Sequence, residues 1–328
     1  MRLGELFCGC GGIALGAKNA GITPVWGIDM NADACQTYRW NICPENPESV
    51  LCADVRDIDF AELPPVDGLA FGFPCNDFST LGKRQGFEGQ YGNLYKYCVE
   101  AIKIHKPKWF FAENVAHIMA IGKRKPFRQI KSEFAVLGYD LYPNTYNFED
   151  YGIPQYRARM IMIGIRNDLG IDFEPPTPTF QHLSCRDALQ NIPENALNHE
   201  KPNHNAKVIE RLSHIRPGES AFQATPHLPP ELRMPKFGNG YFRLDPNKPS
   251  STITGASTFP CHWQELRALT NREAARLQTF PDDFRFWGSK QSVRKQIGMA
   301  VPPKGAEIIF GAILRSFREK GAEKEASP

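Results

Sequence analysis

Residues 3–28, LGELFCGCGGIALGAKNAGITPVWGI, decide the fold. Leu3 to Phe7 is a short apolar run that predicts a strand, and a glycine-rich turn follows it at once. Ile13 to Asn19 then predicts a helix, and Pro24 to Ile28 begins a second strand. This order of elements is a βαβ unit, the building block of parallel sheets.

The same alternation continues along the chain. Further strands are predicted at Val66 to Phe73, Trp109 to Ala112 and Met160 to Ile165, and helices at Leu94 to His105 and Phe127 to Leu137. Strands that alternate with helices indicate an α/β fold with a doubly wound, mostly parallel sheet of the Rossmann-like type, covered by helices on both faces.

From about Ile171 to His262 the pattern changes to short segments broken by prolines, which predicts a second, smaller, loop-rich domain. Helical character resumes at Arg272 to Gln278, and Gly305 to Phe317 is an amphipathic helix that Pro302-Pro303 precedes. We therefore predict a catalytic domain over 1–170, an inserted domain over 171–262, a hinge over 263–295 and a segment over 296–328 that returns to the first domain.

Composition narrows the class of protein without naming it. The formal net charge of the 328 residues is +3, so any nucleic-acid surface has to come from local clusters of basic residues. Nine cysteines without a C-x-x-C pair indicate reduced thiols and no metal site. We find no signal peptide and no apolar run long enough to span a bilayer, and so expect a cytoplasmic protein without a membrane partner.

A thiol stands at the end of the third predicted strand. Cys75 follows Pro74 directly, and the stretch after it is rich in glycine, so the side chain is presented in a loop. A cysteine in that place is a candidate nucleophile, whereas most cysteines only pack as small hydrophobic residues.

The turn after the first strand is a candidate cofactor site. Gly9, Gly11 and Gly12 allow the backbone amides to approach a ligand at a helix N-terminus. Asp29 follows Gly12 at about the interval at which Rossmann folds place a ribose-binding acid. These features alone suit a nicotinamide as well as S-adenosylmethionine.

Six motifs, taken together, resemble those of the DNA cytosine-5 methyltransferases of bacterial restriction-modification systems, in that family's order. They are Phe7-Cys8-Gly9-Cys10-Gly11-Gly12, Phe73-Pro74-Cys75, Glu113-Asn114-Val115, Gln155-Tyr156-Arg157-Ala158-Arg159, the run from Arg272 to Asp282, and the run from Gln296 to Pro303. The resemblance covers most of the chain outside 171–262. It implies that the inserted domain recognises the target sequence in DNA.

The resemblance also implies roles for individual residues. The catalytic residues are Cys75, Glu113, Arg157 and Arg159. The residues that bind S-adenosylmethionine are Phe7, Gly9, Gly11, Gly12, Asp29, Met30, Asp54, Val55, Phe73, Leu94, Ala300 and Val301. The residues that contact DNA are Ser79, Lys83, Arg233 and Arg243.

The implied reaction explains these roles. Carbon 5 of cytosine is a poor nucleophile, so the thiolate of Cys75 first adds to carbon 6, and Glu113 holds cytosine N3. Arg157 and Arg159 stand at alternate positions entering a strand, which predicts that they project to one face and favour the thiolate. The target base has to be flipped out of the duplex. The base that removes the carbon 5 proton is not identified.

Two positions depart from the family's pattern, and three alternatives stay open. Asn76 replaces the usual glutamine and Met299 the usual asparagine, which puts fine contacts to DNA and cofactor in doubt. The alternatives are a tRNA cytosine-5 methyltransferase, a catalytically silent nucleic-acid-binding module, and a nicotinamide dehydrogenase, which leaves Cys75 unexplained. The expected partner is double-stranded DNA, bound by a monomer. A restriction endonuclease acting on the same site is a further expected partner, and Arg272 and Arg276 are expected to brace the hinge.

Overall fold

The computed structural model describes residues 1–73, 93–120, 124–234, 241–255 and 260–326. The chain forms two compact units, the first made of 1–147, 158–177 and 303–328 and the second of 148–157 and 178–302. The second unit is therefore larger than the predicted insertion, because it takes in 148–157 and continues through the predicted hinge to Pro302. The segment from Pro303 onward belongs to the first unit.

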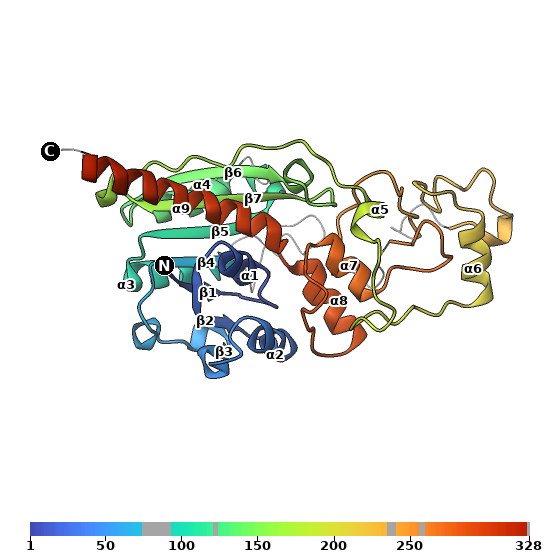
Figure 1. The fold of residues 1–328 in the computed structure, drawn as a ribbon, viewed down its shortest axis with the longest axis horizontal. Helices are drawn as coiled ribbons and strands as arrows, with labels where there is room; N and C mark the ends of the chain where they lie inside the picture. The colour runs from blue at the N-terminus through green and yellow to red at the C-terminus, as the bar shows by residue number, and fades with distance from the viewer. Residues whose placement is uncertain (74–92, 121–123, 235–240, 256–259, 327–328) are drawn as a thin grey trace. The chain divides into compact units, whose positions relative to one another are not determined.

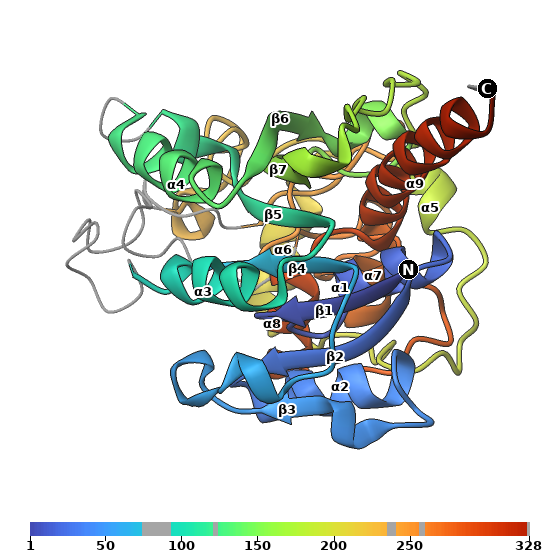
Figure 2. The same ribbon diagram turned by 90° about the vertical axis from the view of Figure 1, so that its left-hand side faces the viewer.

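The first unit is built on one seven-stranded sheet (Figure 2), whose strands follow the order β3-β2-β1-β4-β5-β7-β6. The first five strands of that order are mutually parallel, and β7 runs antiparallel to both of its neighbours. The strands are β1 Arg2–Leu6, β2 Thr23–Asp29, β3 Val50–Cys52, β4 Gly68–Gly72, β5 Trp109–Val115, β6 Tyr139–Asn147 and β7 Ala158–Arg166. The mostly parallel sheet predicted from the sequence is confirmed.

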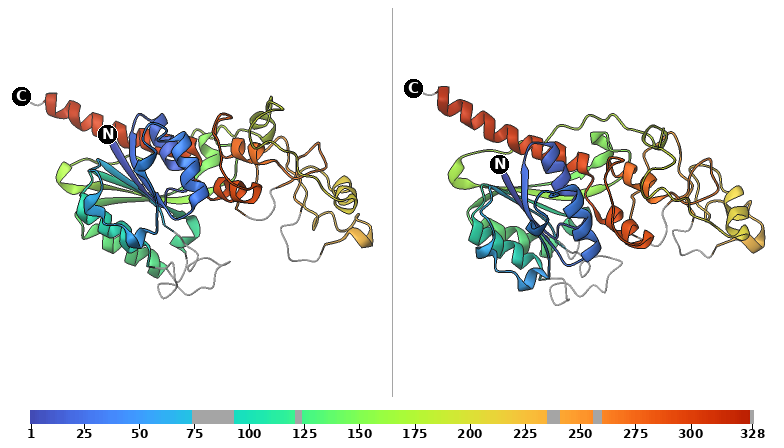
Figure 3. Two further views of the ribbon diagram at one scale, coloured as in Figure 1. Left: turned by 90° about the horizontal axis from the view of Figure 1, so that it is seen from below. Right: turned by 60° about the horizontal axis from the view of Figure 1, so that its bottom comes forward.

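Helices cover both faces of this sheet (Figures 1 and 3). They are α1 Gly12–Asn19, α2 Ala32–Asn41, α3 Tyr95–His105, α4 Lys125–Ala135 and α9 Pro303–Ala326. Successive side chains of β5 point to opposite faces. Trp109 and Phe111 pack on Phe310 of α9, with ring centroids 5.6 and 5.1 Å apart, whereas Phe110 lies 5.0 Å from the ring of Phe134 in α4. The alternation along this one strand shows why the fold needs helices on both sides.

Some elements of the first unit were not predicted, namely α2, β3 and β6. Strand β6 is at the edge of the sheet, is rich in polar residues and contains Pro143. An edge strand pairs on one side only, so it tolerates proline and does not require the apolar run that marks a central strand. The pattern used to predict the inner strands is therefore absent from β6.

The expectation that no apolar run is long enough to span a bilayer was wrong for the segment that includes helix α9. Residues 290–322 are long and apolar enough, by length and composition, to span a membrane, and 61% of the apolar window is buried inside the protein. A buried core helix has the same properties, and Phe310 of α9 packs on β5. We therefore assign α9 to the core of the first unit.

The contact between α1 and α9 depends on one glycine. A Cβ atom added at Gly16 would lie 2.5 Å from the carbonyl oxygen of Pro303, which is backbone and cannot rotate away. We expect Gly16→Ala to lower the free energy of unfolding by about 1–3 kcal/mol. The matched control is Gly311→Ala in α9, where a Cβ has open space and the change should stabilise the helix by about 0.5–1 kcal/mol. Urea denaturation of both variants measures the difference, and equal effects would contradict the close contact.

The second unit holds short helices joined by long irregular segments. In its described residues the helices are α5 Cys185–Ala188, α6 Ala206–Ser213, α7 Asn271–Leu277 and α8 Lys290–Met299. A small apolar core contains Leu212, Ile215, Ala221, Ala224, Leu228, Leu232 and Cys261. Because so little regular structure is present, the irregular segments depend on side chains that bond to backbone carbonyls.

Arg272 and Arg276 illustrate this and have the bracing role expected of them. Arg272 is buried and donates to the carbonyls of Leu197, Pro281 and Phe284. Arg276 forms a salt bridge with Asp282. Both arginines fasten loops to α7, although only Arg276 does so through an ion pair.

Candidate active site

Most of the predicted site residues of the first unit stand at the carboxyl ends of its five parallel strands. Phe7 follows β1, Asp29 ends β2, Asp54 follows β3, Phe73 follows β4, and Glu113 lies near the end of β5. Because these strands are parallel neighbours, their ends meet at one edge of the sheet, where open α/β sheets bind ligands.

The turn after β1 has the backbone of a binding loop. Phe7, Gly9 and Gly11 have φ angles of 55°, 51° and 91°, in the left-handed region that a side chain such as that of Phe7 rarely adopts. A Cβ at Gly11 would also lie 2.7 Å from Cγ1 of Ile42. Helix α1 starts at Gly12, and the preceding residue, Gly11, has no side chain to cap it.

Asp29 ties this loop to the end of β2. One carboxylate oxygen accepts from the backbone N–H of Gly9 at 2.8 Å, and the other accepts from that of Asn31 at 2.8 Å. A carboxylate oxygen can accept more than one hydrogen bond, so this arrangement orients Asp29 and is compatible with hydroxyl donors. Met30, the next residue, is 68% exposed, and its cofactor role stays a prediction.

Asp54 has the loop-capping geometry that is common for aspartate in this kind of turn. It caps a 3-10 turn by accepting from the N–H of Arg56, and the Arg56 guanidinium forms a 2.6 Å salt bridge with it. The hydrogen bonds from the Arg56 side chain and backbone hold the pKa of Asp54 below its ordinary value. Val55 is buried, and Leu94 is half-buried at the start of α3. The cofactor roles of these three residues stay predictions.

A buried acid beneath the loop was missed in the sequence. Glu5 of β1 is 1% exposed and accepts from the Tyr38 hydroxyl at 3.2 Å. Burial raises the pKa of its carboxyl well above the ordinary value. Glutamate between apolar residues in a strand that leads into the glycine turn was the available signal. Glu5 and Tyr38 support the turn from inside the first unit.

Glu113 and Arg159, two of the residues that the resemblance implies are catalytic, form an ion pair that the sequence did not predict. Nε of Arg159 lies 2.9 Å from a carboxylate oxygen of Glu113, and each side chain is about one-sixth exposed. Gly72 pairs with Glu113 across the sheet, and a Cβ there would lie 3.0 Å from the other carboxylate oxygen. Glycine at 72 therefore leaves room for the Glu113 carboxylate.

Asn114 connects this pair to the segment that carries the predicted nucleophile. Its side chain is 2% exposed, and its amide donates to the carbonyl of Phe73 at 3.1 Å. Phe73 is buried and stands two positions before Cys75. Cys75 itself, Asn76, Ser79 and Lys83 lie outside the described residues.

Arg157 has a different environment from Arg159. It belongs to the second unit, is 1% exposed, and donates to the carbonyls of Ile253, Gly298 and Ala300. Arg157 precedes β7, and the backbone of the second unit engages its guanidinium. Because Cys75 lies outside the described residues, an effect of either arginine on the thiolate stays a prediction.

The two described arginines that were predicted to contact DNA have different environments. Arg243 is buried, and its guanidinium donates to the carbonyls of Leu212, Ile215, His262 and Trp263. The prediction that it contacts DNA is corrected: it joins irregular segments inside the second unit. Arg233 is exposed, with Nε donating to the carbonyl of Leu228, so its DNA contact stays a prediction.

The end of α8 carries the last predicted cofactor residues. Ala300 is half-buried and Val301 is buried, both in the second unit, while Met299 is 68% exposed. In the part of the chain that the structure describes, no three His, Cys, Asp or Glu side chains are grouped as a metal site requires.

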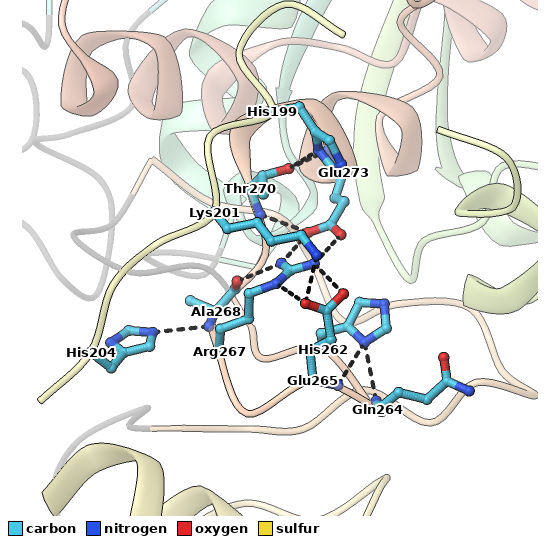
Figure 4. Close-up of polar contacts among 10 residues, drawn as sticks. All are labelled: His199, Lys201, His204, His262, Gln264, Glu265, Arg267, Ala268, Thr270 and Glu273. Atoms are coloured by element: carbon cyan, nitrogen blue, oxygen red, sulfur yellow. Dashed lines mark hydrogen bonds and ion pairs between the residues drawn. The ribbon is translucent and has the colours of Figure 1, made fainter. Parts of the chain in front are cut away.

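The second unit also contains a buried polar cluster (Figure 4). Arg267 donates to both carboxylate oxygens of Glu273 at 2.7 Å and to those of Glu265 at 2.9 Å. His262 accepts from the backbone N–H groups of Gln264 and Glu265 through Nδ1. The accepting nitrogen has to be unprotonated, so the cluster needs a neutral His262.

This cluster predicts an acid-sensitive second unit. Burial lowers the pKa of His199, His204 and His262 below the ordinary 6.5, so the unfolded chain binds more protons than the folded chain as pH falls. Stability is complete above the unfolded pKa, and we expect the melting temperature to fall as the pH drops below about 6.5. Arg267 holds the pKa of Glu265 at about 2, so the carboxylate contribution is lost only at lower pH.

Circular dichroism melts at pH 5 to 8 measure this effect. His262→Gln should make the melting temperature less dependent on pH than that of the wild type. A melting temperature that rises on acidification would contradict the assignment.

Comparisons with known proteins agree with this geometry. The family model of C-5 cytosine-specific DNA methylases matches residues 1–315. The chain is 46% identical to type II methyltransferase M.BbvI of Brevibacillus brevis, over 96% of this chain and 91% of that protein. It is 39% identical to type II methyltransferase M.NgoFVII of Neisseria gonorrhoeae, over 96% and 87% respectively.

A solved structure extends the likeness to the fold. A prophage-encoded protein of E. coli, described as a DNA modification methyltransferase, superposes with a TM-score of 0.77 at 25% identity, covering 97% of this chain and 99% of that one. The strand-end site, the ordered motifs and these matches lead to one conclusion: the chain belongs to the C-5 cytosine-specific DNA methylase family.

Proposed function

We propose that this DNA cytosine-5 methyltransferase acts on a cytosine flipped out of a short duplex target and uses Cys75 as its nucleophile. The observation that carries the proposal is the chain of contacts at the ends of β4 and β5. Arg159 pairs with Glu113, and the neighbouring Asn114 holds the carbonyl of Phe73, two residues before Cys75. The acid and the start of the thiol segment are thereby fixed to adjacent strands.

Each residue has a distinct task in this proposal. The Sγ atom of the Cys75 thiolate forms a bond to carbon 6. The π electrons of the bond between carbons 5 and 6 then raise the electron density at carbon 5, which takes the methyl group. Glu113 holds or protonates N3, which makes carbon 6 of the ring more electrophilic. Arg159 orients the Glu113 carboxylate. Loss of the carbon 5 proton to a base then expels the thiolate and restores the enzyme.

The family uses S-adenosylmethionine, which supplies an electrophilic methyl group when it is bound. The first unit offers one group that fits this molecule directly: the carboxylate of Asp29 suits its ribose hydroxyls. Met30, Asp54, Val55, Phe73 and Leu94 are proposed to surround the adenine. Ala300 and Val301 keep the cofactor role that the resemblance implies for them.

Asp29→Ala should weaken cofactor binding most directly. Loss of two hydrogen bonds to a charged acceptor costs roughly 3 kcal/mol or more, which corresponds to at least about 100-fold in the dissociation constant. Isothermal titration with S-adenosylmethionine measures this change. Asp33→Ala is the control, because Asp33 stands in the first turn of α2 next to the same loop. An unchanged affinity in Asp29→Ala would remove its assigned role.

The cellular role is inferred from the named relatives. Both are type II methyltransferases, so we propose that this enzyme modifies one short sequence and protects it from a companion endonuclease. The endonuclease needs no direct contact with it. A cytoplasmic monomer acting on chromosomal DNA is the simplest form of such an enzyme.

The test is transfer of labelled methyl groups. The protein is incubated with methyl-labelled S-adenosylmethionine and either mixed-sequence duplex DNA or tRNA, and the digested products are separated by chromatography. Labelled 5-methyldeoxycytidine supports the proposal and allows the target to be mapped. Label in tRNA alone would assign the RNA activity instead, and no label in either, with cofactor bound, would indicate a silent binding module.

A further inference from the structure

Two segments of the second unit cross in direct backbone contact at the end of α8. A Cβ atom at Gly298 would lie 2.1 Å from the carbonyl carbon of Thr254 and 2.2 Å from the nitrogen of Gly255. No real side chain tolerates such distances, so only glycine at 298 allows this crossing. Segment 252–255 is thereby fixed against the last turn of α8.

The guanidinium of Arg157 spans this crossing. One terminal nitrogen donates to the carbonyl of Ile253 at 2.8 Å. The other donates to the carbonyls of Gly298 at 3.1 Å and Ala300 at 2.8 Å. The carbonyls at the end of a helix lack intrahelical partners and carry the negative end of its dipole, so a buried cation is favoured there. Arg157 therefore caps α8 and holds segment 252–255 with the same group.

Two buried glutamines complete the connection. Gln155 accepts from the N–H of Ile253 at 2.9 Å and donates to the side chain of Gln278 at 3.0 Å. Gln278 in turn donates to the carbonyl of Ile297 at 2.6 Å and to that of Ala300 at 3.3 Å. Both glutamine side chains are fully buried. The strand-leading segment 155–157, segment 252–255 and the end of α8 thus form one hydrogen-bonded block.

We infer that Arg157, together with Gln155 and Gln278, is a positioning residue that sets the place of Ala300 and Val301 by locking the end of α8 to segment 252–255. This inference rests on the proposed function, in which Ala300 and Val301 contact the cofactor. The groups assigned to the chemistry, Cys75 and Glu113, belong to the first unit. We call the hydrogen-bonded block of Arg157, Gln155 and Gln278 the clamp. Its loss therefore weakens cofactor binding and leaves the chemical step largely intact.

The test compares two buried arginines of the same unit. Arg157→Gln keeps a polar side chain but loses the charge and most of the carbonyl contacts, and Arg157→Lys keeps only the charge. Arg243→Gln is the matched control, since Arg243 also donates to several carbonyls but not to those of the α8 crossing. Gln278→Leu removes three hydrogen bonds of the clamp and serves if Arg157→Gln does not fold.

Two measurements separate the clamp from the proposed function. Amide hydrogen exchange of residues 297–302 and 252–255 should accelerate together in Arg157→Gln, and not in Arg243→Gln, whether or not any cofactor is present. The KM for S-adenosylmethionine should rise about tenfold in Arg157→Gln while kcat at saturating cofactor stays within about threefold of wild type. Arg157→Lys should fall between.

Several results would overturn the inference. Unchanged exchange at 297–302 would show that the clamp does not hold α8, whatever the enzyme does. A large fall in kcat with unchanged KM would make Arg157 a catalytic residue. An equal rise of KM in Arg243→Gln would mean that general loosening of the second unit is responsible. Failure of the wild-type enzyme to methylate DNA would affect the proposed function alone, because hydrogen exchange still tests the clamp.

Discussion

Cys75→Ser is expected to lower methyl transfer by at least about 1,000-fold, because the attack on carbon 6 is lost with the thiolate. A serine hydroxyl is almost entirely protonated near neutral pH, whereas an ordinary thiol with a pKa of about 8.5 already supplies a few per cent of thiolate. The side chains have similar size, so affinity for cofactor and for DNA should change little. Transfer of labelled methyl groups to duplex DNA gives the rate.

The control for Cys75→Ser is Cys52→Ser. Cys52 is an exposed thiol at the end of β3, and its loss should leave turnover near that of wild type. A covalent complex of wild-type enzyme with DNA containing 5-fluorocytosine should survive denaturing electrophoresis and be absent for Cys75→Ser. Normal turnover of the serine variant would rule out the nucleophilic mechanism.

Glu113→Gln is expected to lower turnover by about 100- to 10,000-fold, the range for a positioned acid or base. Glutamine preserves the shape and one hydrogen-bond acceptor, but it cannot protonate N3 and cannot form the 2.9 Å ion pair with Arg159. The expected loss is in kcat, because the interaction is made to the reacting ring. Single-turnover methylation by the variant and the wild type measures it.

A second ion pair, at the amino-terminal ends of β4 and β5, serves as a matched control. Asp67 and Lys108 directly precede β4 and β5 and lie 2.8 Å apart. Asp67→Asn should lower stability slightly and leave turnover unchanged, which separates the chemistry of Glu113 from the general effect of breaking an ion pair. If both variants lost activity equally, the assignment of Glu113 would fail.

The sequence by itself determined the fold class and the family. Apolar runs of the inner strands, the glycine turn and six ordered motifs are local features that need no knowledge of distant contacts. Because the carboxyl ends of parallel strands meet at one edge, the order of strands and motifs was enough to place Asp29 and Glu113 at the same edge of the sheet. The edge strand β6 was not predicted, since its polar composition carries no such local pattern.

Only the tertiary structure decided what each buried arginine does. In sequence, Arg157 and Arg159 stand two positions apart in one motif, yet one donates to backbone carbonyls and the other to the carboxylate of Glu113. Arg243 likewise resembled a DNA contact until its carbonyl partners were known. A guanidinium offers five donors and accepts any suitably placed oxygen. Its role is therefore set by segments about 20 to 140 residues away that only folding brings to it.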